Sequence, residues 1–128
     1  MNIIDGHLPT MMTPKGIEAM IDLGADEQFR YENTFAYISA YRMFFGSSPS
    51  VRDIAEAMKI TVSAAQRRVL VLINRGWLVK TERKARTIRP APVAFHGDQL
   101  EIMDMYRQKW VRHISGTVKT YAPNKSSW

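Results

Sequence analysis

Apolar side chains recur at helical spacing in three long stretches, residues 26–45, 61–74 and 98–115. A period close to 3.6 residues favours an amphipathic α-helix, so we expect a helix over each stretch. The apolar positions are Tyr31, Phe35, Ile38, Tyr41 and Phe45 in the first, Val62, Ala65, Val69, Leu72 and Ile73 in the second, and Leu100, Met103, Tyr106, Trp110 and Ile114 in the third.

Local signals predict shorter elements around these helices. Ser50 and Asp53 have the spacing of a capping box, which predicts a helix over residues 51–58, with Lys59 and Ile60 as a turn. Residues 77–81 and 86–89 predict two strands of a hairpin with a polar tip, ended by two prolines. A further helix is expected over residues 13–24, between a Thr-Pro start and a glycine stop.

The order helix, short helix, turn, longer helix and hairpin is that of a winged helix-turn-helix. We therefore predict a mainly α fold with a small β-hairpin, and with helical extensions at both ends. The expected divisions are an N-terminal extension (residues 1–25), the winged helix-turn-helix domain (26–90) and a C-terminal helix with a tail (91–128).

The helix over residues 61–74 has the chemistry of a recognition helix. Small residues at Ser63, Ala64 and Ala65 allow its start to approach a duplex closely. Gln66 can bind adenine and Arg67 can bind guanine, each through two hydrogen bonds in the major groove. Leu70, on the same outer side, either contacts a thymine methyl group or is covered by the N-terminal extension.

The positive charge is concentrated in the middle of the chain. The net charge is +6, and residues 47–90 carry ten Lys and Arg against three acidic residues. This clustering indicates either an anionic partner such as nucleic acid or a solvated basic surface. The candidate phosphate contacts, in the loop, the helices and the wing, are Ser50, Arg52, Arg68, Arg83, Lys84 and Arg86.

Residues 35–90 contain a run that matches a known pattern. Gly46 to Ala55 read Gly-x-x-Pro-Ser-x-x-Asp-Ile-Ala, and Arg75-Gly76 precede the hairpin. In these motifs the chain resembles the N-terminal winged-helix domain of the LexA repressor family. The resemblance implies a DNA-binding winged helix in which the start of the recognition helix reads bases. Those base-reading positions are Thr61, Ser63, Ala64, Gln66 and Arg67.

The sequence also departs from that family. The chain ends at Trp128, too soon after Pro90 for the family's protease domain, so we expect no self-cleavage. Arg67 and Arg68 stand where the family has acidic or neutral residues, which implies a different base sequence.

The sequence gives little support for other classes of protein. His7, His96 and His113 are widely spaced, there is no cysteine, and no phosphate-binding loop or nucleophile motif is present. No apolar run has the length of a membrane helix, and no signal peptide is evident. We expect a cytosolic protein that is not an enzyme and has no metal, cofactor, membrane or small-molecule substrate.

Trp77, at the start of the predicted hairpin, is expected to be buried in the core.

The helix over residues 98–115 has two possible roles. Its large side chains either pack on the first helix of the same chain or form a homodimer that reads a palindrome. The absence of the family's dimerisation domain favours the dimer. Its candidate residues are Met103, Tyr106, Trp110 and Ile114.

Two functions therefore follow from the sequence. The first is a sequence-specific, double-stranded DNA-binding transcriptional regulator, for which the compact size favours an origin in a phage or another mobile element. The second is a winged-helix module that binds another protein, for example a phage-type accessory protein bound to a host protein.

Overall fold

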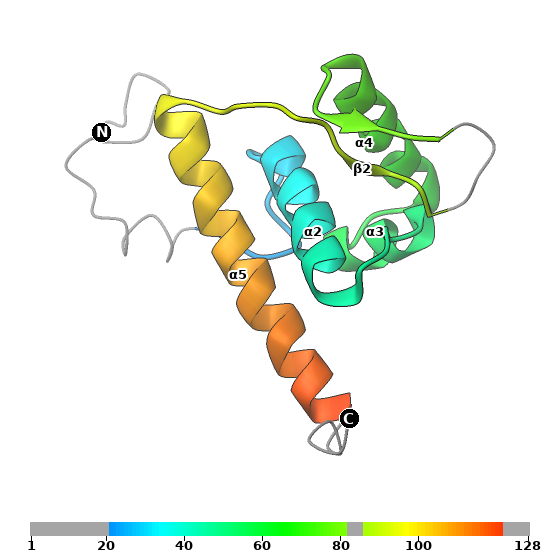
Figure 1. Cartoon of the computed structure of the whole chain (residues 1–128), viewed down its shortest axis with the longest axis vertical. Helices are drawn as coiled ribbons and strands as arrows, with labels where there is room; N and C mark the ends of the chain where they lie inside the picture. Colours follow the sequence, from blue (N-terminus) through cyan, green and yellow to red (C-terminus); the bar gives the residue numbers. More distant parts are fainter. Residues whose placement is uncertain (1–20, 82–85, 122–128) are drawn as a thin grey trace.

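The computed structural model describes residues 21–81 and 86–121, with side chains through Thr117. Most of the helix expected over residues 13–24 lies outside this part. The elements are α2 (Arg30–Phe45), α3 (Val51–Met58), α4 (Val62–Asn74), β1 (Leu78–Val79), β2 (Arg89–Pro90) and α5 (Gly97–Tyr121) (Figure 1). This helical architecture with a small antiparallel sheet is consistent with a winged helix.

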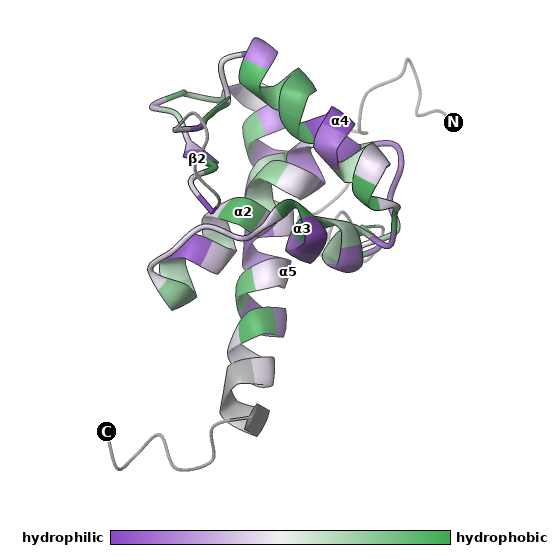
Figure 2. Ribbon diagram, turned by 90° about the vertical axis from the view of Figure 1, so that its right-hand side faces the viewer, coloured by the Kyte–Doolittle hydropathy of each residue, from purple (hydrophilic) through white to green (hydrophobic). Residues whose placement is uncertain are grey.

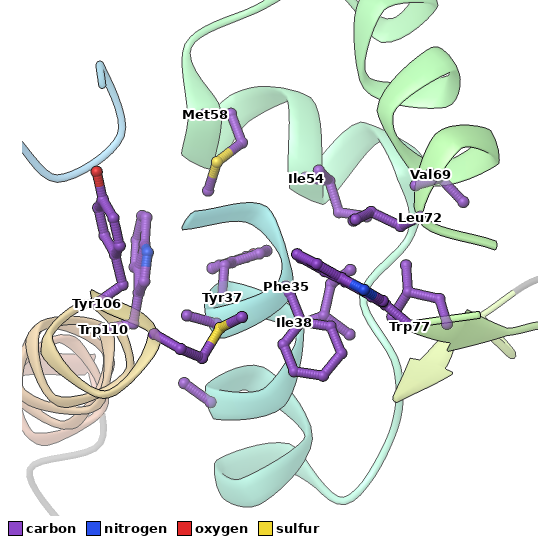
Figure 3. Close-up of a cluster of buried hydrophobic side chains, with 14 of the residues drawn as sticks. Phe35, Tyr37, Ile38, Ile54, Met58, Val69, Leu72, Trp77, Tyr106 and Trp110 are labelled. Carbon is purple, nitrogen blue, oxygen red and sulfur yellow. The ribbon is translucent and has the colours of Figure 1, made fainter. Parts of the chain in front are cut away.

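The α2 helix forms the centre of the fold. It lies between α5 on one side and α3, α4 and β2 on the other (Figure 1). Its middle is therefore buried on every face, including Ala36, Tyr37 and Ala40, which the apolar spacing did not single out. Phe35 and Ile38, which it did single out, are buried, whereas Phe45 at the exposed end is not (Figure 3).

The α2 helix begins four residues later than the expected start at Asp26. The Asp26 carboxylate accepts hydrogen bonds from the backbone N–H groups of Gln28 at 2.8 Å and Phe29 at 3.3 Å. It therefore closes a turn in front of the helix. The expected end at Phe45 is confirmed, because Gly46 adopts the left-handed conformation there.

The sheet is shorter than the sequence predicts. It pairs Leu78 with Pro90 and Val79 with Arg89 in an antiparallel register. Arg86 has a positive φ of 58° and does not belong to an extended strand, and the second strand starts only at Arg89. Pro90 is the last residue of that strand, which therefore ends at the first of the two prolines, one residue later than expected. Trp77 is buried as predicted, with its ring edge-on to the rings of Phe35 and Phe95.

The α5 helix packs on α2 of the same chain (Figure 3). The four dimer candidates Met103, Tyr106, Trp110 and Ile114 are all buried within this one copy. The prediction that they form a dimer interface is therefore wrong, and the alternative of packing on the first helix is confirmed. The apolar stripe alone could not distinguish the two, because either partner would cover it.

Hydrogen bonds fix α5 in this position. The Trp110 indole N–H donates to Asn33 Oδ1 at 2.7 Å, and the Tyr106 hydroxyl donates to the Asp26 carboxylate. Burial, followed by the bond to Asp26, raises the pKa of Tyr106 far above its ordinary value, so the hydroxyl keeps its proton. The helix continues past Gly116, where the sequence predicted its end.

The turn before α2 generates a prediction about Gly24. Gly24 has a φ of +83°, and a Cβ added there would lie 2.7 Å from the carbonyl oxygen of Ala57 in α3. We expect Gly24→Ala to lower the free energy of unfolding by about 2–3 kcal/mol, because a left-handed backbone and a backbone clash both oppose it. Urea denaturation measures this difference.

Gly46→Ala is the matched control. Gly46 has a φ of +70° but nothing within 4 Å of an added Cβ, so only the conformational cost of about 1 kcal/mol applies. Equal losses in the two variants would show that α3 does not press against the turn at Gly24.

Candidate nucleic-acid interface

The α3 and α4 helices form the helix-turn-helix, and both start and stop where the sequence predicts. The Ser50 hydroxyl accepts from Asp53 N–H at 3.0 Å while Asp53 Oδ2 accepts from Ser50 N–H at 2.9 Å, which confirms the capping box. Lys59 takes the left-handed conformation that ends α3. Thr61 Oγ1 accepts from Ala64 N–H at 3.1 Å and starts α4 after this tight turn. The short turn fixes the direction of α4 relative to α3.

The first turns of α4 present polar side chains to solvent. Ser63, Gln66 and Arg67 are exposed, and none of them has a hydrogen bond or ion pair with another described residue. Thr61 is exposed with its hydroxyl committed to the cap, and Ala64 is partly buried. In Figure 2, α4 lies at the edge of the molecule. The five predicted base-reading positions therefore share the accessible start of one helix.

Apolar side chains interrupt this outer face. Leu70 is 54% exposed and Val62 is 41% exposed. The apolar spacing over residues 61–74 predicts Val62 among the buried positions, and this is wrong. The residues that do face inward are Ala65, Arg68, Val69 and Leu72.

Arg68 belongs to this inner face and is the main correction to the predicted phosphate contacts. It is only 8% exposed, and its guanidinium contacts Glu27 Oε2 at 2.9 Å and Thr34 Oγ1 at 3.3 Å. Its side chain therefore ties α4 to α2 and is unavailable as a surface cation. The signal was present in the sequence, since Arg68 follows Ala65 by three positions, as an inner-face residue does.

The other predicted phosphate contacts differ in their surroundings. Arg52 is exposed on α3, and the Ser50 hydroxyl serves first as a helix cap. Arg83 and Lys84 lie outside the described residues. Arg86 sits beside the start of α3, where its guanidinium is 3.3 Å from Asp53 Oδ2 and 3.4 Å from the Ser48 carbonyl oxygen. A hydrogen bond to Tyr41, followed by the charge of Asp53, raises the pKa of Arg86. This cation thus anchors the base of the wing to α3.

Two further arginines near the start of α2 were not predicted. The Arg75 guanidinium lies 4.4 Å from the centre of the Tyr31 ring and 5.3 Å from that of Trp77. Arg30 lies 5.2 Å from the same Tyr31 ring. Cations are held over aromatic rings by the ring quadrupole. Arg30 and Tyr31 also line a hollow of about 320 Å³ with Arg67, Arg68 and the acidic Glu27, so Arg30 adds a cation beside α4. No sequence motif marks this arrangement, because it joins residues 30 and 75.

The part of the chain that the structure describes contains no group of three or more His, Cys, Asp or Glu side chains able to hold a metal ion. None of its helices is long and apolar enough to cross a membrane.

Comparison with known proteins gives a weak and partial match. No protein-family model matches the chain. Over 59 residues it is 34% identical to the LexA repressor of Thermosipho africanus (strain TCF52B). The match spans 46% of this chain and 30% of that repressor. This similarity agrees in part with the resemblance predicted from the sequence motifs.

The contrast between two adjacent arginines gives a stability prediction. We expect Arg68→Ala to lower the free energy of unfolding by about 2 kcal/mol, because it removes packing and a buried hydrogen bond between α4 and α2. Arg67→Ala should change it by less than about 0.5 kcal/mol, since Arg67 is on the surface. Urea unfolding of both variants checks this, and similar losses would contradict the opposite placement of the two side chains.

Proposed function

We propose that the chain is a sequence-specific, double-stranded DNA-binding regulator that inserts α4 into the major groove. The observation that carries the proposal is the division of α4 into two faces. Its inner face is buried against the fold, while Ser63, Gln66 and Arg67 at its accessible start are uncommitted within the described residues. Such side chains supply the hydrogen bonds that distinguish base edges.

The cationic side chains near α4 support binding to the phosphate backbone of DNA. Arg52 lies on α3 and Arg86 at the base of the wing, and Arg83 and Lys84 extend the same charge along the sequence. The partial similarity to a LexA repressor favours the same function. In this proposal these residues hold phosphates and set the position of the protein, while α4 reads the bases.

Selection of duplexes from a random DNA pool at physiological salt tests the proposal. We expect one enriched half-site, because the apolar stripe of α5 is buried within a single copy and forms no dimer interface. An enriched palindrome would instead show a dimer formed through another surface. Affinity should also fall steeply with salt, with log K decreasing by about 0.9 per phosphate contacted for each tenfold rise in salt.

Arg67→Ala tests the base-reading role on the selected duplex. We expect a loss of about 1–3 kcal/mol in binding free energy and a relaxed preference at one base pair. Arg112→Ala on α5 is the control, because it removes the same charge from an exposed position on another helix. An equal loss for all sequences with Arg67→Ala would show that Arg67 contacts only the backbone.

A winged-helix module that binds another protein is the second candidate. The exposed apolar side chains of Val62 and Leu70 on the outer face of α4 favour it, because apolar surface on a recognition helix suits a protein partner as well as a thymine methyl group. A pool selection without any enriched sequence, together with DNA binding that disappears as salt rises, would place this function first.

A further inference from the structure

A cavity of about 490 Å³ lies between α2, α3 and α5. No residue of α4 or of the sheet lines it, although Tyr41 and Asp53 in its lining contact Arg86 at the base of the wing. The volume falls within the range of about 300–1,000 Å³ that small-molecule sites occupy. Most of its lining is aromatic or aliphatic, with a few charged and hydroxyl groups among them. The lining residues that matter for its chemistry are Tyr37, Tyr41, Phe45, Trp110, Asp53 and Glu56.

The Tyr37 hydroxyl has no hydrogen-bond partner among the described residues, although the side chain is only 7% exposed. Its ring is held edge-on to Trp110 at 4.9 Å and beside Tyr41 at 5.9 Å (Figure 3). The hydroxyl is not among buried atoms that lack a partner, so it is accessible from the cavity that Tyr37 lines. A bound molecule can therefore form a hydrogen bond with it.

The charged side chains that line the cavity differ in their hydrogen-bond and ion-pair partners. The Asp53 carboxylate accepts from Ser50 N–H and from Arg86. Glu56 is exposed and forms no ion pair with another described residue, and the positive Lys59 also lines the cavity.

Nearby charges act on the Tyr37 hydroxyl. Burial is the main cause that raises the pKa of its hydroxyl. The negative charges of Asp53 and Glu56 raise it further, and the smaller effect of Arg86 opposes them. The carboxylates of Asp53 and Glu56 therefore act on the hydroxyl, and Glu56, which has no ion-pair partner among the described residues, can attract a cation.

We propose that this cavity binds a small organic cation that consists of an aromatic or aliphatic body and a protonated amine. The body would pack between the rings of Tyr41, Phe45 and Trp110, whose faces also attract positive charge. The ammonium group would donate to the Tyr37 hydroxyl and pair with the uncommitted Glu56 carboxylate. The site requires no DNA, and it stands independently of the proposed function.

Three probes of nearly equal shape test the charge preference on the full chain. They are 2-phenylethylammonium, the neutral 2-phenylethanol and the anionic phenylacetate, titrated by calorimetry at pH 7 without DNA. We expect the cation to bind about 10-fold more tightly than the alcohol, since a cation–π contact and a partly exposed charge pair act together. Phenylacetate should bind more weakly than either. Equal affinities, or no binding of any probe up to millimolar concentration, would overturn the proposal.

Variants locate the site. Glu56→Gln should weaken binding of the cation about fivefold and leave the alcohol within twofold, because only the cation uses the carboxylate charge. Tyr37→Phe should weaken both, since each donates to the hydroxyl. Glu101→Gln is the matched control, because Glu101 is an exposed acid on α5 that does not line the cavity.

Equal effects of Glu56→Gln and Glu101→Gln would show that binding is not in this cavity. Thermal melting of each variant confirms that it is folded. DNA binding measured on the same proteins keeps a failure here distinct from a failure of the proposed DNA function.

Discussion

The fold depends on the hydrogen bond from the Trp110 indole to Asn33 in the middle of α2. Asn33 and Thr34 are buried, and a buried polar side chain without a partner costs free energy. Asn33 obtains its partner from α5, and Thr34 is contacted by Arg68 from α4. Trp110 comes from α5 and Arg68 from α4, so the two buried polar residues of α2 each require a different helix as neighbour. They therefore specify which helix packs on which face of α2, whereas apolar contacts alone are compatible with several arrangements.

The position of the candidate DNA-reading surface follows from this arrangement. Arg68 is drawn inward to Thr34 and Glu27, and the next residue toward the N-terminus, Arg67, is turned about 100° away along the helix and faces solvent. At the other side of the helix-turn-helix, Arg86 joins the wing to Asp53, whose carboxylate also caps α3. The α4 helix and Arg86 at the base of the predicted wing are thus both held to the same core.

The elements that the sequence predicts well are those with local signals. The α3 and α4 helices have the expected ends, because Ser50, Asp53 and Thr61 cap them through contacts within three residues. Two of the parts that failed, the partners of Arg68 and of α5, depend on distant residues. The burial of Arg68 requires Glu27, which lies 41 positions away, and the partner of α5 requires Asn33, 77 positions from Trp110. For the candidate site, the start of α4 could be found from motif and spacing, whereas the cations around Tyr31 and the cavity beside Tyr37 exist only once remote segments meet.

The long separation between Asn33 and Trp110 also has a consequence for the order of folding. A chain emerging from the ribosome exposes α2 first, and α3 and α4 can pack on it soon afterwards through contacts close in sequence. The opposite face of α2, with its unpaired Asn33 amide, must wait until α5 has been synthesised. The nascent chain therefore passes through a stage in which one side of its central helix is uncovered, and α5 completes the core as the last of the described helices to be made.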